Sequence, residues 1–234
     1  MIRIYPANSR YKADHGWLTS HFSFSFAEYF DPNNMSFGPL RVLNDDIVQP
    51  GHGFPPHPHQ EMEIVSIVLK GQLKHEDSIG NAEILQFGQV QRMTAGTGII
   101  HSEMNPSATD EVNLLQLWFL PNQAKLSPSY ETVSYDPQKM NNALLPVVSN
   151  KVQSEHVAYI HQDLTLYLSK LEAKKEISFQ QAPGRRIFLF VIEGDLMIHG
   201  ETQLHTRDSA RITEQDQLDL TTHSGATFML IDLP

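Results

Sequence analysis

The sequence predicts an all-β protein in which one type of β unit occurs twice. Short apolar runs recur along the 234 residues, and Gly, Pro or Asn bounds them, which is typical of a β-sandwich or β-barrel. Convincing helical periodicity is scarce, so we expect few helices. The hexapeptide VLKGQL at 68–73 recurs as VIEGDL at 191–196. This repeat indicates two β units in tandem.

The individual strands follow from the apolar pattern. Residues 21–26, HFSFSF, alternate aromatic and polar side chains, which indicates a half-buried strand. Turn-forming residues follow it, including DPNN at 31–34. Continuous apolar runs predict further strands at 40–43, 63–69, 114–120 and 187–192.

A polar, proline-bearing region lies between the two units. It contains Pro128, Pro137 and Pro146 and no long apolar run, so we interpret it as a linker with a short helix. The predicted domains are a first β-barrel at 1–125, the linker at 126–150 and a second β-barrel at 151–234.

Composition excludes several classes of function. The formal net charge is −10 and the longest basic runs are pairs, whereas nucleic-acid binding needs a clustered basic surface. The chain has no cysteine, so neither disulfides nor thiolate metal sites can form. No apolar stretch approaches the roughly 18 residues of a membrane span, and the first residues lack the apolar core of a signal peptide. We therefore expect a cytoplasmic protein that binds neither nucleic acid nor membrane.

Two pairs of side chains predict a metal site. His57 and His59 are two residues apart, as are His101 and Glu103, and side chains two apart on a strand point to the same face. On neighbouring strands, the two pairs would direct three imidazoles and one carboxylate at one point. This donor set suits iron, manganese or zinc. On a six-coordinate ion it leaves two positions open, which favours a reactive centre over a structural one.

The remaining histidines are weaker candidates. We expect His52 and His75 to face solvent or to support the ligands, not to bind metal themselves. The second unit has no paired spacing, and in the register of the hexapeptide Gln180 stands opposite His57 and Ala182 opposite His59. We therefore expect one metal, in the first unit only. Its affinity should fall below about pH 6.5, because imidazoles bind metal only when neutral.

These motifs resemble a known family. The pattern G-x5-H-x-H-x3-E at 51–63 is similar to the first motif of the cupin superfamily, and the region around His101 is similar to its second motif, with Thr94 where proline is usual. The match is denser with the pirin family within the cupins. It is carried by HGWL at 15–18, FSFA at 24–27, YFDP at 29–32, RVLNDD at 41–46, HPH at 57–59 and TAGTGIIHSE at 94–103.

The resemblance implies a bicupin, two tandem β-barrels of the jelly-roll type with metal in the first only. It implies the ligands His57, His59, His101 and Glu103, whereas Glu63, which matches the general cupin glutamate, is not the usual carboxylate ligand in pirin-like proteins. The ion would be Fe(II) before Mn, Cu, Zn, Ni or Co. Several pirin-like proteins open the flavonol quercetin with dioxygen and release carbon monoxide. In that reaction Glu103 is the expected base, and a flavonol and dioxygen are the substrates. We expect the protein to be a monomer.

Two other functions remain open at this stage. One is a non-catalytic, metal-dependent interaction or redox-sensing protein, as the animal relative of the family suggests. The other is a different cupin reaction, such as sugar isomerisation or acid decarboxylation. Its anionic substrate would require a basic residue in the pocket, for which Arg41 and Arg92 are the candidates.

Overall fold

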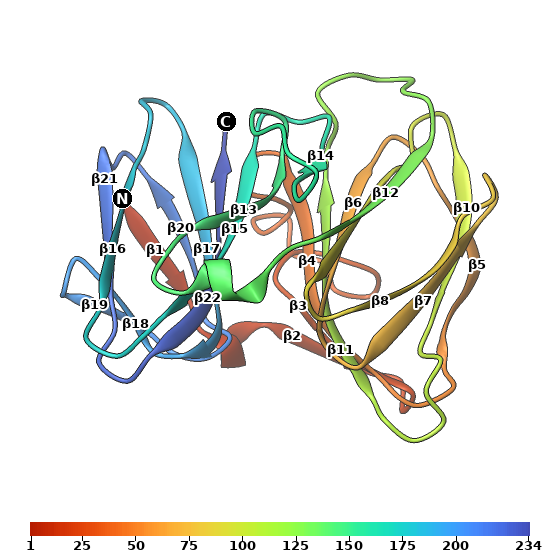
Figure 1. The fold of residues 1–234 in the computed structure, drawn as a ribbon, viewed down its shortest axis with the longest axis horizontal. Helices are drawn as coiled ribbons and strands as arrows, with labels where there is room; N and C mark the ends of the chain where they lie inside the picture. The colour runs from red at the N-terminus through yellow and green to blue at the C-terminus, as the bar shows by residue number, and fades with distance from the viewer. The chain divides into compact units, whose positions relative to one another are not determined.

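The computed structural model describes residues 1–234 and is built almost entirely of β-strands (Figure 1). Its only helices are two short 3-10 helices, Ala7–Ser9 and Pro137–Met140, which confirms the all-β prediction. No helix has the length and apolar character that a membrane span requires. The chain divides into two compact units. The N-terminal unit comprises Tyr11–Tyr135 and Ser154–Gln162, and the C-terminal unit comprises the remaining residues.

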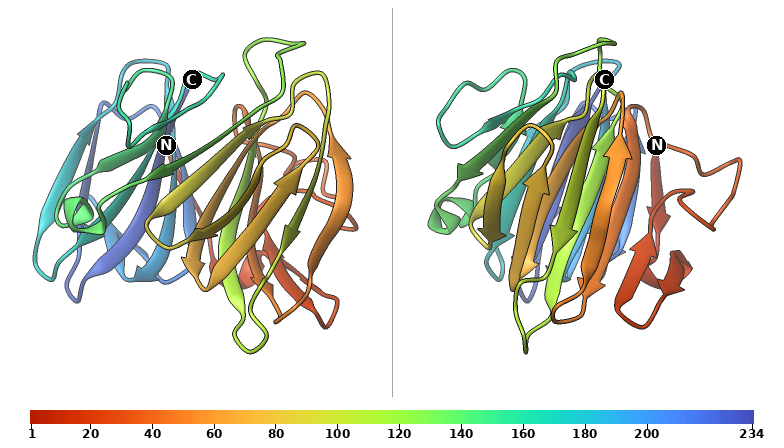
Figure 2. Two further views of the ribbon diagram at one scale, coloured as in Figure 1. Left: turned by 45° about the vertical axis from the view of Figure 1, so that its right-hand side comes forward. Right: turned by 90° about the vertical axis from the view of Figure 1, so that its right-hand side faces the viewer.

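The N-terminal unit consists of two antiparallel sheets whose inner faces meet. Figure 2 shows its orange-to-green strands running side by side in the right-hand view. The larger sheet has the order β12-β9-β6-β11-β4-β3-β2, with β2 at Tyr11–Asp14, β3 at Leu18–Phe22, β4 at Leu40–Val48, β6 at Glu63–Lys70, β9 at Gln89–Thr94, β11 at Val112–Phe119 and β12 at Ser129–Ser134. The smaller sheet has the order β5-β10-β7-β8, with β5 at Gly53–His59, β7 at Gln72–Asp77, β8 at Ala82–Gln86 and β10 at Ile99–Met104. The short strand β14 (Ala158–Tyr159) also belongs to this unit.

The C-terminal unit repeats this plan. Its larger sheet contains the order β1-β20-β17-β22-β15-β13, with β1 at Ile2–Tyr5, β13 at Leu145–Ser149, β15 at Thr165–Leu171, β17 at Arg186–Gly194, β20 at Ser209–Thr213 and β22 at Ala226–Leu233. Its smaller sheet has the order β16-β21-β18-β19, with β16 at Glu176–Gln180, β18 at Leu196–Ile198, β19 at Thr202–Leu204 and β21 at Gln217–Thr221. The order β20-β17-β22-β15 therefore matches β9-β6-β11-β4, and the two smaller sheets correspond strand for strand, which confirms the tandem repeat.

The repeated hexapeptide marks the same corner in both units. It joins β6 to β7 at Gly71 and β17 to β18 near Gly194. Both glycines have positive φ, 78° and 87°, a conformation that side chains disfavour. A Cβ at Gly71 would also lie 2.6 Å from the Glu111 carbonyl oxygen, so glycine is required there by space as well.

The predicted strand at 21–26 is shorter in the structure. β3 ends at Phe22, and the chain then closes a loop in which Ser25 Oγ accepts from the amide of Asp31 and donates to its carbonyl oxygen, both at 2.8 Å. Phe24 is buried without pairing in a sheet. The alternation of aromatic residues thus reflects burial of this segment and not an extended strand.

Residues 126–150, the predicted linker, contain β12, the second 3-10 helix and β13. β12 pairs along its whole length with β9, and Val133 is buried there. The prolines are compatible with this structure because Pro137 lies in the first turn of the helix and Pro146 lies at a register shift in β13.

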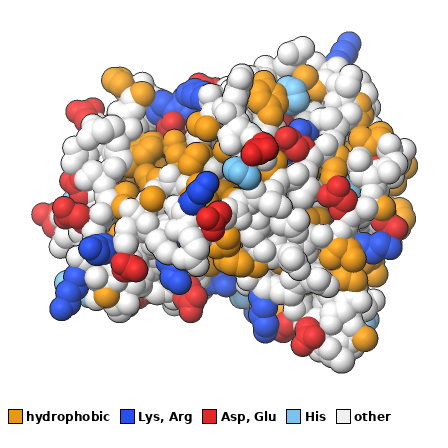
Figure 3. All heavy atoms as spheres, in the orientation of Figure 1, with side chains coloured by type: hydrophobic (Ala, Val, Ile, Leu, Met, Phe, Trp, Pro, Cys, Tyr) orange, Lys and Arg blue, Asp and Glu red, His pale blue; other side chains and the backbone are white.

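On the face shown in Figure 3, basic side chains are scattered among acidic ones.

Candidate metal centre

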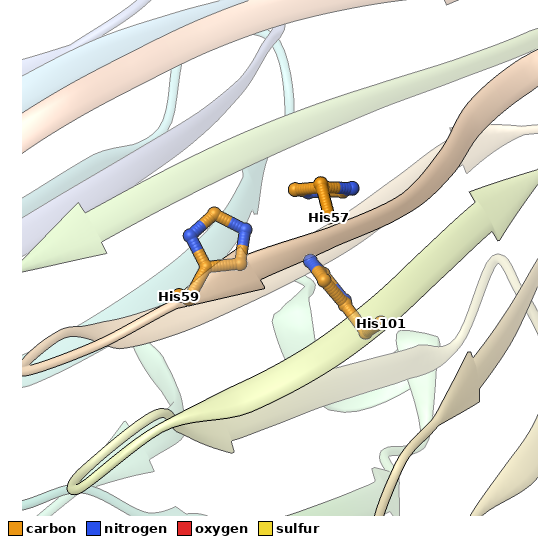
Figure 4. A group of neighbouring side chains, drawn as sticks. All are labelled: His57, His59 and His101. Carbon is orange, nitrogen blue, oxygen red and sulfur yellow. The ribbon is translucent and has the colours of Figure 1, made fainter.

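Three imidazoles converge on the inner face of the smaller N-terminal sheet. His57 and His59 come from β5, and His101 comes from β10, directly opposite His57. Their ring centroids are 4.5 Å apart for His57 and His101, 4.7 Å for His57 and His59, and 4.8 Å for His59 and His101. Figure 4 shows the three rings lying close together from these two adjacent strands. One nitrogen from each ring lies within 4.8 Å of the others.

The free lone pairs point to a ligand. His57 Nδ1 is 2.8 Å from the Pro55 carbonyl oxygen, which can only accept, so Nδ1 carries the proton and Nε2 offers its lone pair. His101 Nε2 is buried and has no hydrogen-bond partner. A divalent ion would satisfy both nitrogens, so the residues present fit a metal.

Burial keeps the imidazoles of His59 and His101 in the form that binds metal. It lowers the pKa of His59 to about 4, with a further contribution from the neighbouring His57. Burial, followed by the other histidines, lowers the pKa of His101 to about 2. Both rings are therefore neutral at pH 7.

Glu103 lies beside the histidine cluster and bridges the two sheets. It comes from β10, two residues after His101, and it is 2% exposed. Gln116 Nε2 of β11 donates to its Oε2 at 2.7 Å, and Ser66 Oγ of β6 lies 3.2 Å from its Oε1. Burial, with a smaller contribution from the nearby Asp46, raises the pKa of Glu103 to about 7, against the opposing effect of the hydrogen bonds from Ser66 and Gln116. One Glu103 oxygen lies within 4.8 Å of ligand nitrogens of His75 and His101.

A bulge and a glycine set the distance between β5 and β10, the strands that carry the three histidines. The register of β10 against β5 shifts between His101 and Glu103, and such bulges re-aim side chains. Gly53 lies opposite Met104, where a Cβ would be 2.2 Å from the Glu103 carbonyl oxygen. Only glycine allows the two backbones to approach this closely.

A third pair of side chains, which the sequence analysis did not assign, supports His101. On β7, His75 and Asp77 are two residues apart and face β10, and both side chains are fully buried. His75 Nε2 lies 3.1 Å from Asp77 Oδ2, so Nε2 carries the proton. Burial lowers the pKa of His75, so its ring is neutral and Nδ1 is an acceptor. That acceptor lies 3.3 Å from Gln91 Nε2 and 3.4 Å from His101 Nδ1, so the two nitrogens share its lone pair as donors, and His101 Nε2 is left free for a ligand.

Of the two positions expected for His75, facing solvent or supporting the ligands, the buried one is observed, next to His101. Its spacing to Asp77 matches that of the other two pairs and was the available signal. Glu63 lies apart from the centre. It is fully buried, and its Oε2 accepts from the His161 amide at 3.1 Å.

A cavity of about 400 Å³ opens on the histidine cluster. Its wall includes five large aromatic side chains, namely Trp17, Phe22, Phe26, Phe54 and Trp118. His57, His59 and Glu103 line one part of it, and Ser20, Asn44 and Asp46 line another. No Lys or Arg lines the cavity. Arg41 instead donates to the carbonyl oxygens of Ser25 and Met35, and Arg92 pairs with Glu131 at 3.0 Å.

Two jelly-roll units in tandem, with a histidine cluster in the first, define a bicupin of the metal-binding type. Family models agree with this class along almost the whole chain. Residues 5–119 match the model described as Pirin, and residues 146–233 match the quercetinase C-terminal cupin domain. The chain belongs to the pirin family, and the resemblance in its sequence is confirmed.

Individual relatives are similar over their full length. The chain is 39% identical to the quercetin 2,3-dioxygenase of Escherichia coli (strain K12) over 234 residues, which are 100% of this chain and 99% of the relative. It is 36% identical to the putative quercetin 2,3-dioxygenase PM1685 of Pasteurella multocida, with complete coverage of both chains. Among solved structures, the bacterial pirin YhhW of Escherichia coli in complex with nickel(II) is similar with a TM-score of 0.94 and 39% identity, covering 100% of this chain and 99% of that one.

Proposed function

We propose that the protein is a metal-dependent dioxygenase that opens the heterocyclic ring of quercetin-like flavonols with dioxygen and releases carbon monoxide. His57, His59, His101 and Glu103 would hold one divalent ion, with Fe(II) as the proposed native metal. When bound, the ion supplies Lewis acidity and reactivity towards dioxygen. The names of the relatives support this activity, and the nickel(II) complex of a relative supports a divalent ion.

The observation that carries the proposal is the aromatic-walled cavity that opens on the histidines and Glu103. Its volume of about 400 Å³ lies within the range of ligand pockets. Flat aromatic rings suit walls made of Phe and Trp side chains. The lack of any lining Lys or Arg disfavours the anionic substrates of sugar isomerases and acid decarboxylases.

The surroundings of Glu103 suit a group that takes up and returns a proton. Ser66 Oγ lies 3.2 Å from Glu103 Oε1 and 2.6 Å from Gln116 Oε1. When Glu103 is ionised, the Ser66 hydroxyl can donate to it. When Oε1 is protonated, Ser66 can accept that proton's hydrogen bond and turn its own hydrogen to Gln116. Oε2 keeps its bond from Gln116 in both states. Glu103 is therefore proposed as both a ligand and the base that removes a flavonol hydroxyl proton.

Oxygen uptake by the iron-loaded protein with quercetin tests the activity, with carbon monoxide measured in parallel. We expect the wild type to consume dioxygen and release carbon monoxide in equal amounts. Glu103→Gln, reloaded with metal, should lose most of the turnover. Glu63→Gln is the matched control, because it changes a second buried glutamate of the same unit outside the cavity.

Each negative result has a definite meaning. If reloaded Glu103→Gln turns over at the wild-type rate, Glu103 is not the base. If metal-loaded wild type consumes no dioxygen with any flavonol, the dioxygenase proposal fails, and the non-catalytic interaction or redox-sensing role takes its place.

A further inference from the structure

Part of the cavity wall carries a cluster of polar side chains that the proposed reaction does not use. We call Ser20, Asn44 and Asp46 the β3–β4 cluster, after the strands that carry them. Asn44 and Asp46 are two residues apart on β4 and so share a face. Ser20 lies directly opposite Asp46 on β3. All three line the cavity, yet they are only 1%, 4% and 4% exposed.

The cluster has hydrogen-bonding capacity that the protein leaves unused. Asn44 Oδ1 is buried and has no hydrogen-bond partner. In Asp46, Oδ1 accepts a hydrogen bond from Ser20 Oγ, so only one of its two oxygens is engaged by that contact. A buried polar atom without a partner is destabilising, so such an atom on a cavity wall points to a ligand that supplies the missing bond.

The chemistry of the cluster indicates an uncharged hydroxyl on an aromatic ring. A hydroxyl has one hydrogen to donate and can also accept, so it can donate to Asn44 Oδ1, or accept from Asn44 Nδ2 while it donates to Asp46. An anion would meet two buried carboxyl groups, Asp46 and Glu103, with no lining Lys or Arg to balance them. Phe22, two residues from Ser20 on β3, adds an aromatic surface directly across from Asn44.

The cluster lies within reach of a molecule that also contacts Glu103. Asn44 is the cross-strand partner of Gln116, so their Cα atoms are about 5 Å apart. Gln116 Nε2 in turn is 2.7 Å from Glu103 Oε2. A fused aromatic ring system can therefore present one hydroxyl to Glu103 and a second to Asn44.

We propose that the β3–β4 cluster is a specificity site that binds a ring hydroxyl of a polyhydroxylated flavonol, other than the hydroxyl that reacts. This inference rests on the proposed function, which supplies the flavonol. It implies that the protein selects among flavonols by the hydroxyls they carry away from the reacting position, with Asn44 as the main contact.

Anaerobic binding titrations test the site separately from turnover. Trp17 and Trp118 line the cavity, so quenching of tryptophan fluorescence reports occupancy. The probes are quercetin and 3-hydroxyflavone, which carries only the reacting hydroxyl. We expect metal-loaded wild type to bind quercetin at least about tenfold more tightly, the equivalent of one good hydrogen bond at about 1.4 kcal/mol. Asn44→Leu should remove this preference and leave the affinity for 3-hydroxyflavone within about twofold.

A second variant guards against general damage to the cavity. Phe54→Leu trims the aromatic wall away from the cluster and should weaken both ligands by the same factor. Equal losses for both ligands in Asn44→Leu would overturn the inference, as would no loss for either. If Asn44→Leu does not fold, equal affinities of the wild type for the two probes would overturn it without any variant.

Failure of this inference and failure of the proposed function look different. Selective binding of quercetin through Asn44 without oxygen uptake would sink the dioxygenase proposal and leave the site standing. Oxidation of quercetin at a rate and affinity independent of Asn44 would sink only the specificity site. Absence of binding by either flavonol would overturn both.

Discussion

The two units share the order of their main strands, but the interior of the N-terminal unit is partly polar, whereas that of the C-terminal unit is apolar. In the N-terminal unit, the inner face of the smaller sheet carries the histidine cluster and Glu103. In the C-terminal unit, the corresponding inward positions hold apolar residues, which belong to one continuous core or pack against it, namely Ile177, Phe179, Leu218 and Leu220. In the N-terminal unit, two separate apolar clusters are found instead, one around Leu73 and Val112 and one around Met93 and Ile99.

This difference shows that the fold does not require the site. The same pair of sheets can close on apolar side chains, as the C-terminal unit does. The polar interior of the N-terminal unit therefore costs stability and is explained by what it binds, because function resides in a site grafted onto the fold.

The comparison also corrects the register expected from the repeat. Gln180 was expected to stand opposite His57, but it is exposed and pairs with Gln217 through a 2.6 Å side-chain hydrogen bond. The inward residues of β16 are Ile177 and Phe179. A shift of one residue turns a strand over, so a repeat located in β17 does not fix which side of β16 faces the core.

The largest effect is expected from removing two of the imidazoles. His57→Ala/His101→Ala should reduce metal content from one ion per chain to almost none, because one carboxylate and one histidine do not make a tight site. The matched control is His199→Ala/His205→Ala, which removes two histidines of the C-terminal unit. Elemental analysis decides the question, and a full equivalent of metal in the first variant would show that the site lies elsewhere.

The next effect tests the interior of the C-terminal unit. Leu220 is fully buried in the apolar core, so Leu220→Ala should lower the free energy of unfolding by about 3 kcal/mol. Metal content should not change. Chemical denaturation and elemental analysis on the same sample check both statements. A loss of metal with little loss of stability would contradict the assignment of metal binding to the N-terminal interior and of stability to the C-terminal one.

A smaller effect is expected from the support behind His101. His75→Phe can keep the stacking on Tyr130, whose centroid is 4.5 Å from that of His75, but it removes the acceptor for His101 Nδ1. Metal affinity should fall about 10- to 100-fold. Chelator competition measures it, and the visible spectrum of the cobalt-loaded protein should also change. Tyr130→Phe serves as the control, and unchanged affinity in His75→Phe would remove His75 from any positioning role.

The smallest effect is the pH dependence of metal affinity, which distinguishes protonation of the Glu103 carboxylate from protonation of the imidazoles. The pKa of Glu103 is raised to about 7, so its proton must leave before the carboxylate can bind metal. Affinity should therefore fall up to tenfold per unit as pH drops below about 7, and it should level off above that pH. His59 contributes only near pH 4, where its own pKa lies. Glu103→Gln should flatten the profile between pH 5 and 7, and a decline that persists in this variant would assign it to the imidazoles.

The sequence predicted what depends on local spacing. Side chains two apart on a strand share a face in any sheet, so the His57 and His101 pairs were visible without the fold. The β3–β4 cluster was not visible without the fold, although Asn44 and Asp46 lie within the RVLNDD motif at 41–46. Its meaning depends on the cross-strand partners Ser20 and Gln116, which are fixed by the pairing of distant segments.

The chain of hydrogen bonds from Asp77 through His75 to His101 has a spectroscopic consequence. It predicts a proton on His75 Nε2 and another on His101 Nδ1, and both residues are buried from solvent. Ring protons of exposed histidines exchange with water too quickly to be observed by NMR, whereas protected ones can give separate downfield signals. The signal of His101 Nδ1 should shift or broaden when a paramagnetic ion enters the centre, while that of His75 Nε2, one ring farther away, should respond less. The polypeptide thus carries its own reporter of metal occupancy, which can be read without any label.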